Sequence, residues 1–74
     1  MKLTDDEHQV MVDHFGGGVT PNLEDVETTE LVVMLKAVAR AVGASIQDGD
    51  VKALEVLEPL EEKLEKKLRE RVTR

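Results

Sequence analysis

The central stretch of the sequence, residues 31–42, restricts the possible folds more than any other segment. Its apolar residues recur at helical spacing along one face: Leu31, Met34, Leu35, Val38, Ala41 and Val42. Further apolar residues, Val32, Val33, Ala37 and Ala39, widen this face until the polar side is marked only by Thr29, Lys36 and Arg40. A helix with so wide an apolar surface has to be covered from more than one direction. The rest of the chain must therefore supply elements that pack on it.

We expect this central helix to span residues 21–43. Thr20 and Pro21 have the residue types of an N-cap and a first helical position, because proline there gives up an amide that is unpaired in any helix. Gly43 is the expected C-terminal cap. The acidic stretch that precedes the apolar face leaves an alternative open, in which the helix bends or begins anew at Thr28.

The N-terminal residues predict a short helix over residues 4–15. Thr4 and Glu7 have the spacing of a capping box, in which each side chain accepts a hydrogen bond from the other residue's amide. Three consecutive glycines then begin a joint over residues 16–20. Phosphate-binding loops place such glycines after a strand and within G-x-G-x-x-G or before Gly-Lys-Ser/Thr, and neither context is present. We interpret the glycines as a joint between two helices.

A turn over residues 43–48 and a third helix over residues 49–72, capped by Asp48 or Asp50, are expected to complete the fold. Pro59 either kinks one long helix or begins a separate one, and the order of acids and bases after it slightly favours a separate helix. The apolar stripe of this segment is narrow and consists of Ala53, Leu57, Leu60, Leu64 and Leu68. Three ion pairs are predicted at a spacing of four: Glu62 with Lys66, Glu65 with Arg69, and Glu70 with Arg74.

These patterns predict an all-α fold in a single domain of 74 residues. It has three helices, or four if the last segment splits at Pro59, in a small bundle or a helical hairpin with a short N-terminal helix. A core of this size rarely supplies more than about 3–5 kcal/mol. Without cysteine, neither a disulfide nor a thiolate metal site can add to that stability. We therefore expect self-association to complete the fold.

Charge is divided unevenly along the chain, which has a net charge of -6. Residues 1–30 contain eight acids and one lysine, whereas residues 63–74 contain six bases and two acids. The two ends should attract each other. The candidate basic tail that could contact phosphates comprises Lys63, Lys66, Lys67, Arg69 and Arg71. The overall negative charge disfavours nonspecific binding to nucleic acid or to anionic membranes.

Catalytic chemistry has little support in the sequence. His8 and His14 are six residues apart, which places them on different sides of a helix rather than at the i, i+4 spacing of metal ligands. We expect His14 to be half buried beside Met11 and His8 to be solvated. Ser45 is the only serine, and a helix cap is a simpler role for it than that of a nucleophile. We expect a protein that is not an enzyme, with no metal and no cofactor.

The segment ETTELVVML, residues 27–35, resembles the second helix of acyl carrier proteins, and the size, acidity and helical pattern of the chain are similar to those of that family. The family attaches its prosthetic arm to an Asp-Ser-Leu motif just before this helix, where the present sequence has LEDVE, without serine. The resemblance therefore transfers no site residue to this chain.

No segment has the pattern of a signal peptide or of a membrane span. The start of the chain leads into acids, and the most apolar stretch is only twelve residues long and contains Lys36 and Arg40. We expect a cytoplasmic protein without a membrane partner.

The wide apolar face predicts a helical interaction, assembly or adaptor module that binds itself, as a homodimer or a higher oligomer, or another protein. The candidate interaction residues are Leu31, Met34, Leu35, Val38, Val42, Leu57, Leu60, Leu64 and Leu68. The alternative is a small regulator linked to nucleic acid, through the basic tail or through an acidic surface that occupies a DNA-binding partner.

Overall fold

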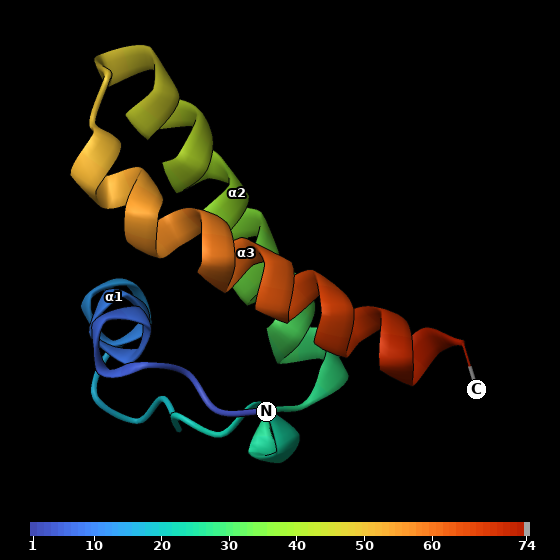
Figure 1. Ribbon diagram of the computed structural model, residues 1–74. Helices are drawn as coiled ribbons and strands as arrows, with labels where there is room; N and C mark the ends of the chain where they lie inside the picture. The colour runs from blue at the N-terminus through green and yellow to red at the C-terminus, as the bar shows by residue number, and fades with distance from the viewer. Residues whose placement is uncertain (74) are drawn as a thin grey trace.

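The computed structural model describes residues 1–73 and has the all-α architecture that the sequence predicts. Its elements are α1 (Asp5–Phe15), the short 3-10 helix η1 (Leu23–Asp25), α2 (Thr28–Asp48) and α3 (Val51–Val72). Helices α2 and α3 form a hairpin in which they lie side by side, and α1 packs against α3 beside it (Figure 1). The described residues contain three α-helices, so the four-helix alternative is wrong.

Helix α1 begins as the sequence predicts. The Thr4 hydroxyl accepts from the Glu7 amide at 3.2 Å, and the Glu7 carboxylate accepts from the Thr4 amide at 2.8 Å. The helix ends where Gly16 adopts a φ of 93° and donates its amide to the Val12 carbonyl. The glycine joint therefore follows α1 at the expected place.

The start of the central helix differs from the prediction. Thr20 and Pro21 do not begin a helix: Asn22 caps η1 instead, and α2 begins at Thr28, the alternative that the sequence left open. The reason is a short backbone pairing with the N-terminus, in which the Leu3 amide donates to the Pro21 carbonyl at 2.8 Å and the Leu23 amide donates to the Met1 carbonyl at 3.0 Å. A backbone paired in this way cannot continue a helix.

The end of the central helix is also later than predicted. Gly43 and Ser45 lie inside α2, and the expected turn over residues 43–48 is helical. The cap is Gly49, which has a left-handed φ of 68°, and its amide donates to Ile46 while the Asp50 amide donates to Ser45 at 2.9 Å. These two bonds form a Schellman cap, which requires a residue that tolerates positive φ. The prediction of Ser45 as a cap is wrong because its side chain is buried within α2.

Helix α3 is continuous through Pro59, so the slightly favoured split into two helices is wrong. Of the two predicted caps, Asp50 is the N-cap, and it accepts from the Ala53 amide at 3.1 Å, whereas Asp48 lies in α2. Pro59 and Glu55 are both exposed, so the carbonyl that loses its helical donor lies on the solvent side of the helix. The flanking Leu57 and Leu60 are buried against the core and hold the two halves in one direction.

The core closes within one chain. Leu31 and Val38 of α2 and Leu60 and Leu64 of α3 are almost completely buried, and Met11 of α1 is buried with them. The full set of buried apolar residues is Leu3, Met11, Leu23, Val26, Leu31, Met34, Val38, Val42, Leu57, Leu60 and Leu64. The wide face of α2 is thus covered from several directions, by α3 and by the segment that precedes α2.

Candidate interaction groove

An open groove lies between the end of α1, the joint and the first turns of α2. Its volume is about 470 Å³. The residues that line it are Phe15, Gly18, Val19, Thr20, Asp25, Val26, Thr29, Glu30, Val33 and Met34. We refer to this feature as the interaction groove.

The surface of the interaction groove is mainly apolar. Phe15 and Val33 keep 38% and 57% of their surface exposed, and both belong to the small set of large apolar residues that remain in contact with solvent. Val19 is half buried, while Val26 and Met34 are buried and form part of the lining. Two exposed apolar side chains on a shared concave surface are a stronger indication of a contact site than scattered ones.

The glycine joint forms one wall of the interaction groove. Gly16 turns the chain away from the end of α1, and no atom lies within 4 Å of the positions that Cβ atoms would occupy at Gly17 and Gly18. The joint is held at its far end, where His8 Nε2 donates to the Val19 carbonyl at 2.7 Å. The groove therefore results from the path of residues 16–20 between α1 and the segment before α2. This path is a property of the fold and not of a sequence motif.

The charged residues in the lining are all acidic. Asp25 and Glu30 line the interaction groove, and Glu27 lies exposed between them at the start of α2. Glu27 is the N-cap residue of α2 but makes no side-chain cap hydrogen bond. No lysine, arginine or histidine is among the lining residues of the described chain.

Three bases of α3 lie along one face of the helix, four residues apart, and hold the N-terminal half of the chain. Lys63 Nζ donates to the Glu7 carboxylate at 2.6 Å. Lys67 pairs with Glu24, and also reaches Glu70 at 3.5 Å. We refer to Lys63, Lys67 and Arg71 as the basic ladder.

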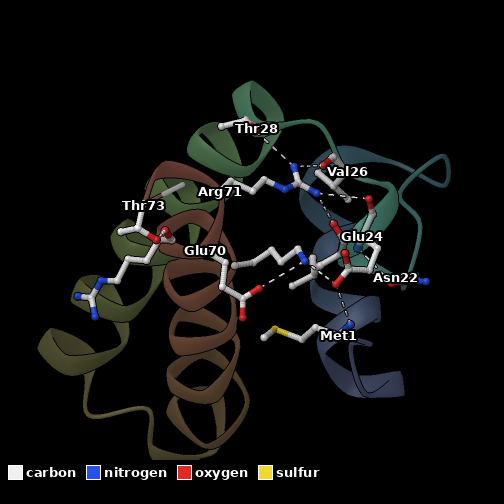
Figure 2. Close-up of polar contacts among 11 residues, drawn as sticks. Met1, Asn22, Glu24, Val26, Thr28, Glu70, Arg71 and Thr73 are labelled. Atoms are coloured by element: carbon white, nitrogen blue, oxygen red, sulfur yellow. Dashed lines mark hydrogen bonds and ion pairs between the residues drawn. The ribbon is translucent and has the colours of Figure 1, made fainter.

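Arg71 binds main-chain carbonyls rather than a carboxylate. Its guanidinium donates to Val26, to Leu23 at 3.0 Å and to Glu24 at 3.3 Å, and so satisfies carbonyls in and just after η1 (Figure 2). It also reaches the Thr28 hydroxyl at 3.5 Å. The attraction between the acidic and basic ends that the sequence predicts is thus realised as specific contacts between α3 and residues 7–28.

These contacts lower the pKa of two carboxylates. Burial of Glu7 by itself raises its pKa, but the hydrogen bonds from Lys63 and from the Thr4 amide, with the Lys63 charge, outweigh burial and lower the pKa below its ordinary value. The hydrogen bond from Lys67, assisted by the N-terminal ammonium group 3.4 Å away, lowers the pKa of Glu24. Both carboxylates are therefore ionised in the folded protein at neutral pH.

The candidate interaction residues from the sequence lie mainly in the core. Leu35 and Leu68 are half buried, and the others are buried: Leu31, Met34, Val38, Val42, Leu57, Leu60 and Leu64. Of the whole set only Met34 reaches the interaction groove. Phe15, Val19 and Val33 were not among the candidates, because helical periodicity identifies an apolar face but not which edge of it stays uncovered.

The candidate basic tail is divided between two environments. Its Lys63, Lys67 and Arg71 form the basic ladder, while Lys66 and Arg69 are exposed. Arg69 makes the predicted pair with Glu65 at 3.6 Å. The predicted pair of Glu70 with Arg74 involves a residue outside the described chain.

The environments of the two histidines are the reverse of those predicted. His14 is exposed and its Nδ1 donates to the Val10 carbonyl at 2.9 Å, whereas His8 is half buried because its ring is held by Val19. Within residues 1–73, no group of three or more histidine, cysteine, aspartate or glutamate side chains is placed to hold a metal ion. None of the helices in this range is long and apolar enough to cross a bilayer.

No protein-family model, curated protein or solved structure matches this chain.

Proposed function

We propose that this protein is a small, non-enzymatic interaction module that binds an apolar segment of a partner in the interaction groove. The observation that supports the proposal is that Phe15 and Val33 are both exposed on one concave surface. Complete burial of a fully exposed apolar side chain of this size contributes about 1.5–3 kcal/mol, and a partner would gain the part that corresponds to the 38% of Phe15 and the 57% of Val33 that remain exposed. A few such side chains typically dominate the binding energy of an interface, and Phe15 and Val33 would be the apolar anchors of the complex.

The interaction groove replaces the centre of α2 as the proposed binding surface. The central apolar residues of α2 are used in the core, so their exposure to a partner would require unfolding. The groove adjoins the same helix at its first turns and needs no such rearrangement. Assembly and adaptor roles both remain forms of this proposal, including a homo-oligomer in which a second copy fills the groove.

Nucleic-acid binding through the basic tail has less support. The side chains of the basic ladder are engaged with Glu7, Glu24 and the carbonyls around η1. Binding phosphates with them would break contacts that hold the fold together. Lys66 and Arg69 remain exposed, and Arg69 is next to Glu65.

The proposal is tested by selecting binders from a displayed library of random peptides. Val33→Gln removes an apolar contact from the interaction groove, and Ile46→Gln is the matched control, because Ile46 lies on the same helix, is 62% exposed and is outside the groove. We expect selected peptides to lose about tenfold or more in affinity for Val33→Gln, which corresponds to about 1.4 kcal/mol, and none for Ile46→Gln. Circular dichroism establishes that both variants are folded.

Two results would contradict the proposal. One is a selection that enriches no peptide. The other is a set of peptides whose affinities for Val33→Gln and Ile46→Gln are equal, since their binding would then not use the interaction groove.

A further inference from the structure

We infer that the occupant of the interaction groove is a cationic peptide segment of another protein, in which a bulky apolar side chain is flanked by lysine or arginine. This inference rests on the proposed function and adds to it the chemistry of the partner. Three observations support it: the sign of the charges in the lining, the absence of counter-charges for them in the described chain, and the size of the groove.

The sign of the lining charge selects the partner. Asp25 and Glu30 border the apolar surface, with Glu27 beside them. An anionic peptide would be repelled by these carboxylates. A peptide with only apolar side chains would take water from them without offering a positive charge, which is costly for a charged group. A peptide with a base next to its apolar side chain satisfies both parts of the groove.

The carboxylates of the groove are not neutralised from within the described chain. The ion pairs among residues 1–73 use Glu7, Glu24, Glu65 and Glu70, and none of them includes Asp25, Glu27 or Glu30. The basic ladder approaches the same part of the molecule but points its side chains to other acceptors. The two carboxylates in the lining, Asp25 and Glu30, are therefore free to bind an external cation.

The size of the groove sets the length of the recognised segment. A volume of about 470 Å³ lies within the range of roughly 300–1,000 Å³ that is typical of sites for small ligands. Such a space accommodates one or two bulky side chains and not the whole face of a long helix. The partner is accordingly a short linear segment.

The test uses three synthetic peptides that share a leucine pair and differ only in the flanking residues, which are lysine, serine or glutamate. Affinities are measured by fluorescence anisotropy. We expect the lysine peptide to bind at least about tenfold more tightly than the serine peptide at about 0.05 M salt, and the difference to shrink at about 0.5 M because salt screens exposed charges. The glutamate peptide is expected not to bind.

A pair of matched double variants separates the groove from the overall charge. Asp25→Asn with Glu30→Gln removes two carboxylates of the groove, whereas Glu55→Gln with Glu58→Gln removes two exposed carboxylates of α3. Both variants change the net charge equally. We expect only the groove variant to lose the preference for lysine over serine, by about tenfold.

The outcomes distinguish this inference from the proposed function. If the lysine and serine peptides bind with equal affinity, and Val33→Gln weakens the binding of both, the inference is overturned while binding in the groove is supported. An oligomer that Val33→Gln dissociates and Ile46→Gln does not would also overturn it, since a second copy would then fill the groove. If no peptide binds and the library selection is also empty, both proposals fail.

Discussion

At the scale of single residues, Glu7 joins a local and a long-range interaction. Its carboxylate caps α1 through the Thr4 amide and, in the same position, accepts from Lys63 on α3. The Glu7 side chain is only 4% exposed. A nearly buried carboxylate of this kind is tolerated because both of these donors compensate for the water that it has lost.

Replacement of Glu7 by glutamine should destabilise the fold. Glutamine keeps an oxygen for the Thr4 amide but removes the charge opposite Lys63, and hydrogen bonds to charged groups contribute about 1.5–3 kcal/mol. We expect Glu7→Gln to lower the free energy of unfolding by about 1–3 kcal/mol in urea titrations. Glu62→Gln, at an exposed position of α3, is the control. Equal free energies of unfolding for the two variants would show that the contact with Lys63 contributes no net stability.

The stability of the protein should fall in acid, in part through Glu7. Its folded-state pKa lies below the unfolded value of about 4.3, so the folded state binds the proton less readily than the unfolded chain. The stabilisation is therefore complete above that value and is lost as the pH falls through the folded-state pKa. Thermal melting between neutral and acidic pH should show a shallower decline for Glu7→Gln than for the unsubstituted protein. Parallel declines would contradict the assignment.

At the scale of elements, the length of α2 depends on which glycine ends it. Gly43 follows the apolar Val42 and Gly49 follows the acidic Asp48, but only Gly49 has a positive φ, and Gly43 lies inside the helix. The two glycines therefore have different roles, since Gly43 continues α2 and Gly49 ends it. A local signal is likewise overridden at Pro59, where α3 stays continuous and the leucines on either side, Leu57 and Leu60, are buried.

Alanine substitutions at the two glycines should change stability in opposite directions. A Cβ at either position meets no atom within 4 Å, so sterics with neighbouring elements do not decide the result. Gly49→Ala should cost about 1–2 kcal/mol because of its left-handed φ. Gly43→Ala should stabilise the protein by about 0.5–1 kcal/mol, since alanine favours a helix interior over glycine. Thermal or urea unfolding of both variants measures this, and a change of the same sign in both would contradict the placement of the cap.

At the scale of the whole molecule, the basic ladder connects elements that the chain separates widely. Lys63 and Lys67 contact residues 56 and 43 positions earlier, and Arg71 joins the last turn of α3 to η1 and the start of α2 (Figure 2). The ladder and the shared core together hold the N-terminal segment against the hairpin. The fold can therefore close without a second chain.

A closed core predicts that folding does not depend on association. Leu31, Leu60 and Leu64 are completely buried within one chain, so dilution should not expose them. We expect the helical circular dichroism signal to stay constant across a dilution series while sedimentation measures the mass. Loss of helicity as the mass decreases would contradict this and would restore the self-association that the sequence suggested as part of the fold.

The all-α class, the capping box of Thr4 and Glu7, an aspartate cap at position 48 or 50 and the attraction between the charged ends could all be predicted from the sequence. The caps depend on atoms only three residues apart, and the charge attraction depends on net sign rather than geometry. Such features act in the same way whatever the rest of the chain does. The sequence by itself therefore determined where α1 begins and limited the cap of α3 to Asp48 or Asp50.

The tertiary structure alone decided where α2 begins and ends, whether Pro59 breaks α3 and which apolar residues stay exposed. The local signals at Pro21 and Gly43 resemble true helix boundaries, but pairing with the N-terminus and burial of Ser45 override them. The interaction groove is also decided by the tertiary structure, because the exposure of Phe15 and Val33 depends on how α1, the joint and α2 meet. Burial is a sum over contacts between distant parts of the chain, and no local pattern contains that sum.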